Sequence, residues 1–509
     1  MEWWKRAVVY QVYPRSFQDS DGDGNGDLSG IIQRLEYLQW LGVDAIWCSP
    51  FFQSPKVDGG YDISDYTAID PIYGTMDDFD RLLERAHQLG MRVILDLVPN
   101  HTSDQHPWFR ESRADRTNPR ADWYHWQDER PNSWVDASGK PAWTWCEERR
   151  QYYYHAFFPQ EPDLDWRNPD VRQAIFEVMR FWLGRGADGF RVDLIWHLIK
   201  DALLREDPLN PDYDPENDDP STVRLPVFSS NQHEVHDMVR MLREVVDEFD
   251  DRVLIGEIYL PVGQVVTFYG EQHKGLHLPF NFQLIRLQWT AQHLAAGISK
   301  YFGELPHKGW PNWVLGNHDQ SRVASRVGES KARIGAVLLF TLQGTAFVYY
   351  GDEIGMVDGD VDPEEMRDPL KDVAPKFSRD PQRTPMQWSA ARAAGFTTGD
   401  PWLPVSRWTN VEEARADPQS MLHLYRDLIA LRAAEPALLE GACFPYPAPG
   451  DVLAYRRGQD FLIVANLGDR EKTIDARGTI AICTDRRRDR ERVEGALTIG
   501  ANSAVVLRV

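Results

Sequence analysis

The stretch at residues 169–193, PDVRQAIFEVMRFWLGRGADGFRVD, shows the pattern on which the fold depends. An amphipathic helical segment, Pro169–Arg185, runs into a short strand candidate at 189–193 that ends in a carboxylate. Alternation of strands and helices implies parallel strand pairing, and eight such units imply a closed barrel. The pattern recurs along the chain, with strand candidates at 8–13, 45–49, 92–98, 189–193, 252–258, 278–284, 313–317 and 346–351.

Helical patterns lie between most of these strand candidates, at 28–41, 77–89, 169–185, 235–249 and 333–342. The sequence therefore predicts an α/β fold of the (β/α)8 TIM-barrel type. A doubly wound open sheet is the alternative, but the chain has no glycine turn of the dinucleotide-binding type to support it.

Three segments depart from the alternation. Residues 102–165, rich in Trp, Pro and charge, are too long for an ordinary loop, and we expect an inserted domain over the top of the barrel. Residues 201–232 predict a long irregular loop, and 354–416 predict an irregular excursion after the last barrel strand. Short alternating strands follow. The predicted division is 1–101 and 166–435 for the barrel, 102–165 for the inserted domain and 436–509 for a C-terminal antiparallel β-sandwich.

The chain has 509 residues and a formal net charge of −22. Such an acidic surface repels nucleic acid, and no apolar stretch is long enough to cross a membrane. The N-terminus lacks a secretory signal pattern, and the four cysteines lack metal or disulfide spacing. We therefore expect a cytoplasmic enzyme with free thiols, a monomer or small homo-oligomer that acts on neutral substrates.

Polar residues gather at the carboxyl ends of four predicted strands, where barrel active sites are built. Carboxylates are costly to hold away from water without a task, and four such ends on one face predict an active site. A cap for the next helix is the alternative for any one of them alone. The segments are Asp96-Leu-Val-Pro-Asn100-His101, Gly189-Phe-Arg191-Val-Asp193, Gly256-Glu257 and Gly316-Asn317-His318-Asp319.

These segments resemble, in order and approximate spacing, the four signature regions of the α-amylase family, glycoside hydrolase family 13. The resemblance covers essentially the whole chain. It implies a retaining, exo-acting α-glucosidase that releases glucose from short α-1,4- or α-1,6-linked gluco-oligosaccharides. Further motifs resemble the oligo-1,6-glucosidase and α-glucosidase branch, namely Gln11-Val-Tyr-Pro-Arg15, Gly60-Tyr61-Asp62-Ile-Ser-Asp65-Tyr66, Gly351-Asp352-Glu353 and Arg379-Asp380-Pro-Gln-Arg383-Thr-Pro-Met-Gln-Trp388.

The resemblance assigns Asp193 as the nucleophile and Glu257 as the acid/base of retaining hydrolysis. Arg191 lies two residues before Asp193, hence on the same strand face, and its charge should keep Asp193 ionised. Glu257 should instead have a raised pKa so that it holds a proton near neutral pH. Asp319 is the third family carboxylate, a clamp on sugar hydroxyls. His101 and His318 are expected to contact the same sugar, although either histidine alone would more often be structural.

The resemblance also implies a closed end of the substrate pocket. Tyr61 would stack on the first sugar, while Asp62 and Arg383 would close around its non-reducing-end hydroxyls. Such a charged pair blocks further subsites and makes the enzyme exo-acting. A surface salt bridge is the alternative for Arg383, and its choice over Arg379 of the same motif depends on the family pattern alone.

The segment Asp19-Ser-Asp21-Gly-Asp23-Gly-Asn25-Gly-Asp27 supplies acidic oxygens at alternate positions with glycines for sharp turns, much like an EF-hand loop. The matching loop of the family branch binds calcium. We predict a structural Ca2+ site, with a solvated acidic turn as the alternative and no organic cofactor. The ligands would be Asp19, Asp21, Asp23, the Asn25 carbonyl and Asp27.

Two other functions occur among proteins that resemble this chain. Catalytically dead relatives serve as subunits of amino-acid transporters, but they carry a membrane helix and lack parts of the carboxylate set. Glucosyl-transferring or isomerising relatives, such as sucrose isomerase or trehalose synthase, share the chemistry as far as the glucosyl-enzyme. Residues 320–327 lack the alternating Arg/Asp pattern of sucrose isomerases.

The linkage that the enzyme cleaves stays open at this point. In this branch the residue after the nucleophile tends to be Val in α-1,6 enzymes and Ala or Thr in α-1,4 enzymes, whereas here it is Leu194. The segment Glu161-Pro-Asp163-Leu-Asp165 resembles the family's fifth region but ends in Asp where the 1,6-type usually has Asn.

Overall fold

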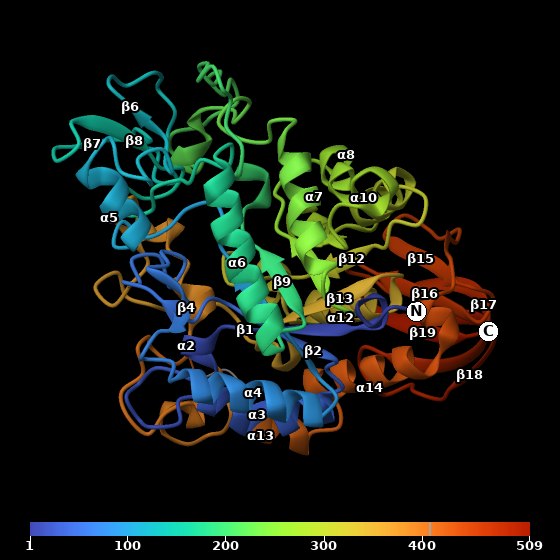
Figure 1. The fold of residues 1–509 in the computed structure, drawn as a ribbon. Helices are drawn as coiled ribbons and strands as arrows, with labels where there is room; N and C mark the ends of the chain where they lie inside the picture. Colours follow the sequence, from blue (N-terminus) through green and yellow to red (C-terminus); the bar gives the residue numbers. More distant parts are fainter. Residues whose placement is uncertain (407–408) are drawn as a thin grey trace.

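The computed structural model describes residues 1–406 and 409–509 and contains the predicted TIM barrel (Figure 1). Eight strands form one parallel sheet in the order β11-β10-β9-β5-β2-β1-β13-β12. Their positions agree with the strand candidates of the sequence. The strands are β1 (Val8–Val12), β2 (Ala45–Cys48), β5 (Arg92–Leu97), β9 (Gly189–Val192), β10 (Val253–Gly256), β11 (Leu278–Pro279), β12 (Asn312–Val314) and β13 (Thr345–Tyr349).

Side-chain hydrogen bonds join β11 to β12 at the edge where the ladder stops. Asn312 Nδ2 donates to the Pro279 carbonyl at 2.6 Å, and Asn312 Oδ1 accepts from the Asn281 N–H at 3.0 Å. The sixth strand is shorter than the predicted 278–284, because Asn281 Oδ1 accepts from the Gln283 N–H and the chain turns into α9 (Gln283–Arg286).

Seven longer helices surround the barrel, and local signals set their ends. For α6, Asn168 Oδ1 accepts from the Asp170 N–H at 2.9 Å, and Pro169 occupies the first turn, where its missing N–H costs nothing. The helix ends at Gly186, whose φ of 116° is a conformation that other residues rarely adopt. The seven are α3 (Leu28–Leu41), α4 (Met76–Gln88), α6 (Pro169–Arg185), α7 (Val235–Val246), α10 (Ala291–Glu304), α12 (Glu329–Thr341) and α14 (Met421–Ala434).

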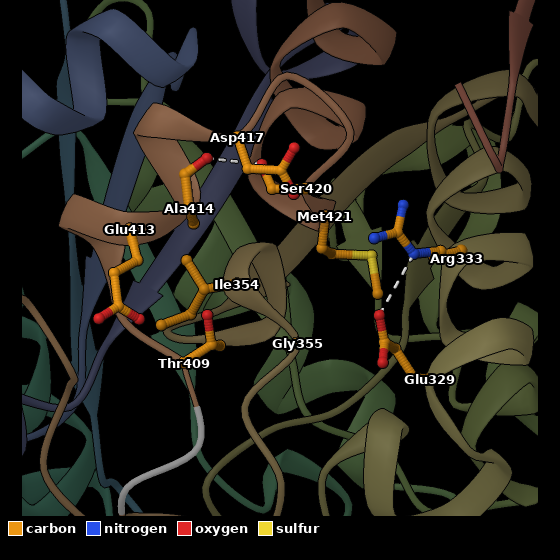
Figure 2. A pocket seen from close by; sticks show the side chains of 10 residues that line it. All are labelled: Glu329, Arg333, Ile354, Gly355, Thr409, Glu413, Ala414, Asp417, Ser420 and Met421. Atoms are coloured by element: carbon orange, nitrogen blue, oxygen red, sulfur yellow. Dashed lines mark hydrogen bonds and ion pairs between the residues drawn. The ribbon is translucent and has the colours of Figure 1, made fainter. Parts of the chain in front are cut away.

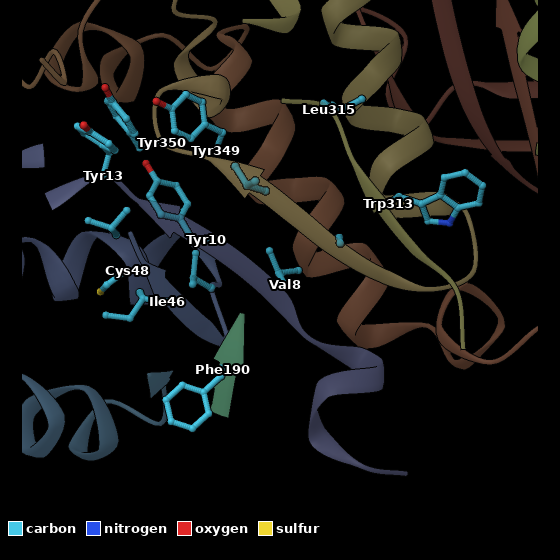
Figure 3. Packing of buried hydrophobic residues seen from close by; sticks show 14 of the residues in the cluster. Val8, Tyr10, Tyr13, Ile46, Cys48, Phe190, Trp313, Leu315, Tyr349 and Tyr350 are labelled. Atoms are coloured by element: carbon cyan, nitrogen blue, oxygen red, sulfur yellow. The ribbon is translucent and has the colours of Figure 1, made fainter. Parts of the chain in front are cut away.

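The barrel strands are buried on both faces, and alternate residues belong to different cores. Tyr10, Ile46 and Phe190 belong to the large cluster shared with the helices (Figure 3). Val9 and Trp47, one position away in β1 and β2, belong to a second cluster that fills the barrel. Because side chains alternate along a strand, this parity also decides which strand-end residues face the barrel mouth.

Residues after β5 form the predicted inserted unit, shown in cyan in Figure 1. It contains α5 (Pro107–Ala114) and an antiparallel sheet of β6 (Trp126–Gln127), β8 (Gln151–Tyr154) and β7 (Trp143–Cys146). Trp134, Trp143 and Tyr154 form its own small core, against which Leu204 of the 201–232 loop also packs. The long loop is therefore attached to the inserted unit.

The C-terminal residues form the antiparallel β domain that the sequence predicts. The six strands pair as one continuous sheet, because the twelve-residue β17 pairs with both β18 and β19. One face packs on the barrel helices, where Tyr455 and Thr341 hydroxyls lie 2.5 Å apart. The strands are β14 (Cys443–Pro445), β15 (Val452–Arg457), β16 (Phe461–Asn466), β17 (Lys472–Cys483), β18 (Arg492–Ile499) and β19 (Ser503–Arg508).

Two further sequence expectations can be compared with the described ranges. None of their helices is both long and apolar enough to cross a membrane. All four cysteines are free thiols, as predicted, with Cys48 and Cys483 buried and Cys146 and Cys443 partly buried.

Candidate active site

Strand register brings the polar segments together at the carboxyl end of the barrel. Arg191 in β9 pairs with Asp96 in β5 on one side and with Ile255 in β10 on the other. Asp193 and Glu257 follow directly after their strands, with the Glu257 N–H donating to the Val192 carbonyl at 2.9 Å. The predicted grouping of these strand ends therefore exists in the structure.

One guanidinium group holds three buried carboxylates at this point. Arg191 Nη1 lies 2.7 Å from Asp96 Oδ1 and 2.7 Å from Asp193 Oδ1, and its Nη2 lies 2.8 Å from Glu257 Oε1. Below it, the Trp47 ring centroid lies 5.1 Å from the guanidinium carbon. This arrangement fixes the two predicted catalytic carboxylates relative to each other.

The backbone after the nucleophile also positions the acid/base. Leu194 has φ 44° and ψ 37°, a left-handed conformation that costs a residue with a side chain about 1–2 kcal/mol. This turn directs the Leu194 N–H to Glu257 Oε2 at 3.1 Å. The strained turn therefore supplies a fixed donor to the second oxygen of Glu257.

Burial and crowding control the protons of this group. Burial raises the pKa of Asp193 well above its usual range, and the neighbouring Glu257 and Asp96 add to this, while Arg191 opposes it. Burial likewise raises the pKa of Glu257, again opposed by Arg191. Three carboxyl groups around one cation hold a proton to higher pH than an isolated carboxyl group does, so that a proton donor and an ionised nucleophile can coexist.

Asp319 lies in a different electrostatic environment. Its Oδ1 lies 2.9 Å from Arg383 Nη2, and its Oδ2 lies 3.1 Å from His318 Nε2. Burial opposes its ionisation, but His318, Arg383 and Arg379 outweigh that effect and hold the pKa of Asp319 well below its usual range. Its side chain keeps 23% of its surface exposed, so this carboxylate is available to a ligand.

Tyr61 and His318 form an aromatic wall next to these carboxylates. Their rings are parallel within 2°, with centroids 5.3 Å apart. The Tyr61 hydroxyl donates to Asp96 Oδ2 at 3.2 Å, and Gln11 Nε2 lies 2.9 Å from His318 Nδ1. Burial lowers the pKa of His318 to about 3, so the ring is neutral at physiological pH.

The comparison with protein families gives the identity of this arrangement. The family described as "Alpha amylase, catalytic domain" matches residues 11–441, which include all four strand ends. The chain belongs to the α-amylase family. It is therefore a glycoside hydrolase, and the resemblance seen in the sequence is confirmed.

Individual relatives of this α-amylase-family chain bear names of glucosidases. A probable α-glucosidase of Rhizobium meliloti is 40% identical over 90% of this chain and 87% of its own length. Maltase A1 of Drosophila melanogaster is also 40% identical, over 93% of this chain and 89% of its own length. The oligo-1,6-glucosidase of Heyndrickxia coagulans is 37% identical, over 93% of this chain and 94% of its own length.

Solved structures of the same fold include transferring and isomerising enzymes. The α-glucosyl transfer enzyme XgtA has a TM-score of 0.92 and 39% identity, with all of both chains covered. The trehalulose synthase MutB has a TM-score of 0.91 and 33% identity, again over both whole chains.

Among the described residues, Asp62 and Arg383 make separate contacts, and their closure around a sugar stays a prediction. Asp62 instead holds its own loop, because its carboxylate accepts from the Ser54 hydroxyl at 2.9 Å and from the Val57 N–H at 2.9 Å. Arg383 contacts Asp319. In the described ranges, the pair that links these two segments is Asp58 with Arg379.

Arg379 is the residue that sequence reasoning left aside in favour of Arg383. Besides Asp58, it contacts Asp368 at 2.7 Å through Nε and Asp319 at 3.4 Å through Nη1. It thus joins the irregular excursion to the loop after β2. Arg379 and Arg383 lie four positions apart in one motif, and the sequence contains no signal that distinguishes their roles.

His101 lies where the barrel meets the inserted unit. Its neighbour Asn100 donates to Asp163 Oδ2 at 2.9 Å, and Lys200 contacts Asp163 at 2.5 Å and Asn100 Oδ1 at 2.9 Å. The His101 Nε2 atom is buried and has no hydrogen-bond partner, and it lies 3.6 Å from Glu161 Oε1. His101 therefore lies at the junction of the barrel and the inserted unit, and its contact with a sugar stays a prediction.

The acidic loop brings together only part of its predicted ligand set. Oxygens of Asp19, Asp21 and Asp27 lie within 4.8 Å of one another. Asp23 Oδ1 accepts from the Asn25 N–H at 2.7 Å, outside this group. The three grouped carboxylates are hard oxygen ligands of the kind that calcium takes.

A cavity of about 340 Å³ lies away from these strand ends, beside α12, α14 and α13 (Val411–Ala416) (Figure 2). Glu329 and Arg333 on its wall form an ion pair of 3.5 Å. None of the predicted catalytic or substrate residues lines it. It is not a candidate for the catalytic chemistry.

Proposed function

We propose that the chain is a retaining, exo-acting α-glucosidase that releases glucose from the non-reducing end of short α-1,4- and/or α-1,6-linked gluco-oligosaccharides. One observation carries the proposal, namely that Asp193 and Glu257 contact the two Nη atoms of Arg191 at 2.7 and 2.8 Å. Carboxyl groups held this closely suit the separation of about 5–5.5 Å in retaining enzymes, whereas inverting enzymes leave about 6.5–9.5 Å for a water molecule. The names of the relatives support the substrate class.

In the first step, an Asp193 oxygen attacks the anomeric carbon while Glu257 gives its proton to the glycosidic oxygen. The bond between that oxygen and the anomeric carbon breaks, the leaving sugar departs as an alcohol, and an ester links glucose to Asp193. Asp319, held ionised by Arg383, stabilises the positive charge that develops on the sugar ring.

In the second step, Glu257 is a carboxylate and takes a proton from water as the water oxygen attacks the anomeric carbon. The ester bond breaks, which restores the Asp193 carboxylate and the protonated Glu257. Two inversions at one carbon give net retention, so glucose leaves as its α-anomer.

Contacts around the barrel mouth support an exo-acting pocket. Asp58 and Arg379 tie two loops together at one side. On another side, Asn132 Nδ2 of the inserted unit donates to the Leu204 carbonyl at 3.0 Å, and Lys376 Nζ donates to the Glu216 carbonyl at 2.8 Å. The 201–232 loop thus bridges the inserted unit and the excursion, which restricts the room for long chains.

Chain-length dependence tests the exo proposal. The value of kcat/KM should fall beyond maltotriose or isomaltotriose, and a shortened 211–220 segment should relieve that fall. Rapid loss of iodine staining from starch, with maltodextrins as early products, would show an open cleft and contradict the proposal.

A glucosyl-transferring or isomerising function is the second candidate, and the fold similarity to XgtA and MutB favours it. The glucosyl-enzyme would be the same, and only the acceptor would differ. Product analysis on maltose, isomaltose, sucrose and trehalose separates the two. Free glucose as the main product supports hydrolysis, and new disaccharides as the main products support transfer.

We also propose a structural Ca2+ in the acidic loop, held by Asp19, Asp21 and Asp27. Gly24 in this loop has φ 95°, and a Cβ there would lie 2.0 Å from the Asp400 carbonyl. The loop therefore packs tightly on the excursion, and a bound cation would stabilise that contact. A small neutral oligosaccharide is the proposed partner, and the cytoplasmic location stays a prediction.

A further inference from the structure

The side chain of Gln11 in β1 is buried and contacts the ring of His318, the residue before Asp319. Its Nε2 lies 2.9 Å from His318 Nδ1 and donates to Ser49 Oγ at 3.2 Å. The other ring nitrogen, His318 Nε2, lies 3.1 Å from Asp319 Oδ2. A buried amide is therefore linked through one imidazole ring to the third family carboxylate.

Packing fixes the position of this ring but not that of its proton. Tyr61 and Tyr13 stack on it, with ring centroids 5.3 and 5.9 Å from that of His318. Arg383 Nε donates to the His318 carbonyl at 2.9 Å, which holds the backbone. These contacts act on the faces of the ring and on the backbone, so the polar partners at Nδ1 and Nε2 decide which nitrogen carries the proton.

The charge of Asp319 places the proton on Nε2. Burial lowers the pKa of His318 to about 3, so the ring is neutral and carries one proton. Asp319 is ionised, with Arg383 Nη2 2.9 Å from its Oδ1. A carboxylate only accepts hydrogen bonds, so the nitrogen that faces it must be the donor, and Nδ1 is left as an acceptor.

The amide of Gln11 is turned so that it matches this acceptor. With Nε2 towards the ring, its two hydrogens reach His318 Nδ1 and Ser49 Oγ, and Oε1 stays buried without a partner. With the amide turned over, Oε1 would face the Nδ1 lone pair and repel it. We propose that Gln11 is a positioning residue that stabilises the Nε2-protonated tautomer of His318 and thereby supplies a fixed donor to Asp319. The inference rests on the proposed α-glucosidase function, in which Asp319 stabilises the charge on the sugar ring.

The first test measures the position of the proton in the wild-type protein. When histidine is labelled with nitrogen-15, protonated and unprotonated ring nitrogens have different NMR chemical shifts, and the His318 signals are those lost in His318→Asn. At neutral pH, Nε2 should be the protonated nitrogen and Nδ1 the unprotonated one. A proton on Nδ1 would overturn the proposal.

Gln11→Glu keeps the volume of the side chain and replaces the donor by a carboxyl group. At low pH this group and His318 share one additional proton, so Asp319 still accepts from Nε2. As pH rises and that proton leaves, the introduced carboxylate draws the remaining ring proton to Nδ1, because Asp319 already has two arginine partners. The kcat on p-nitrophenyl α-glucoside should then fall about tenfold, through a limb at lower pH than the alkaline limb of the wild type.

The other groups around the ring stay the same in this variant. Burial raises the pKa of Tyr13 and Tyr61, so both stay neutral. A new limb in Gln11→Glu is therefore due to the introduced carboxyl group and the proton that it shares with His318. The charged residues that face the ring are Asp319, Arg383, Arg191 and Arg379.

Two further variants keep the test decisive if Gln11→Glu does not fold. Gln11→Met keeps the volume without a donor, and kcat should fall about threefold to tenfold with no new limb. Ser49→Ala removes the other acceptor of the amide, and it should keep kcat within about threefold together with the pH profile of the wild type.

The outcomes separate the role of Gln11 from that of the fold. An unchanged pH profile in Gln11→Glu, or kcat within about twofold of wild type in Gln11→Met, would overturn the proposal. Equal losses in Ser49→Ala and Gln11→Met would show that the amide acts only through packing. A wild type inactive on the glucoside would instead overturn the proposed function, and the nitrogen shifts would still establish the tautomer.

Discussion

Two acidic clusters of the molecule are held together by different means. At the barrel mouth, Asp193 and Glu257 contact one buried cation, Arg191, which strand register places between them. In the loop at residues 19–27, Asp19 and Asp27 instead accept from backbone N–H groups, each with a contact of 2.7 Å. The first cluster keeps its carboxylates crowded and short of positive charge, which suits proton transfer. The second satisfies its carboxylates locally, which suits a structural role.

The largest effect is expected from a substitution that disrupts the barrel-mouth cluster and leaves the acidic loop unchanged. Asp193→Asn should lower kcat by about 10³- to 10⁵-fold, because the attacking carboxylate is lost while the volume and fold stay the same. Steady-state hydrolysis of p-nitrophenyl α-glucoside, with circular dichroism for the fold, measures this. Asp19→Asn is the matched control and should retain kcat within about threefold. Activity of Asp193→Asn within tenfold of wild type would contradict the assignment of Asp193 as the nucleophile.

The next effect concerns the ion pair between Asp58 and Arg379. Arg379→Ala should lower kcat/KM on maltose by about 2–3 kcal/mol, or roughly 30- to 150-fold, because Asp58 and Asp368 lose their charged partner. Arg185→Ala, which removes an ion pair with Asp80 on the exterior, is the control and should have little effect. Equal activity of both variants would show that the Asp58–Arg379 pair has no part in binding.

The pH dependence of kcat/KM should respond to substitutions in the barrel-mouth cluster and not to those in the acidic loop. Burial raises the pKa of both Asp193 and Glu257, so a proton held by this pair leaves at higher pH than it would leave an ordinary carboxyl group. The kcat/KM should be bell-shaped, falling about tenfold per pH unit beyond each limb. Glu257→Gln should lose the alkaline limb on an activated aryl glucoside, whereas Asp21→Asn should keep it. A limb that persists in Glu257→Gln would assign that proton to another group.

The smallest effect concerns the acidic loop. If calcium binds there, a hundredfold excess over the dissociation constant should stabilise the fold by about 2.7 kcal/mol. Asp21→Asn should abolish this gain, and Asp23→Asn should reduce it less, since Asp21 belongs to the grouped carboxylates and Asp23 does not. Calorimetry with calcium or chelator measures it, and elemental analysis identifies any metal retained. Equal losses in both variants would contradict the difference between the two residues.

Residues at strand ends were easier to predict from the sequence than strand lengths and pairing. Positions at strand ends, such as Arg191, Asp193 and Glu257, follow from alternation and barrel topology, which leave little freedom. The sixth strand was overestimated because Asn281 hydrogen-bonds across to β12 and turns the chain early. The pairing of β17 with both β18 and β19 cannot be seen in the strand patterns of the sequence.

Loop residues were harder to place, because their side-chain directions depend on individual turns. Gly59 and Gly60 both have positive φ, 62° and 111°, and they turn the chain between Asp58 and Asp62. Asp58 therefore meets Arg379 while Asp62 faces its own loop, an outcome that residue type and spacing alone do not contain.

Proton NMR of the first product from maltose tests the central claim most directly. If Asp193 forms a covalent glucosyl-enzyme that water then opens, the α-anomer signal of the glucose released from the non-reducing end should appear first. Beyond the β-anomer share that the reducing-end glucose already had in maltose, the β-anomer should grow only as mutarotation proceeds. A β-anomer signal that leads from the earliest spectra would show single displacement and contradict the account.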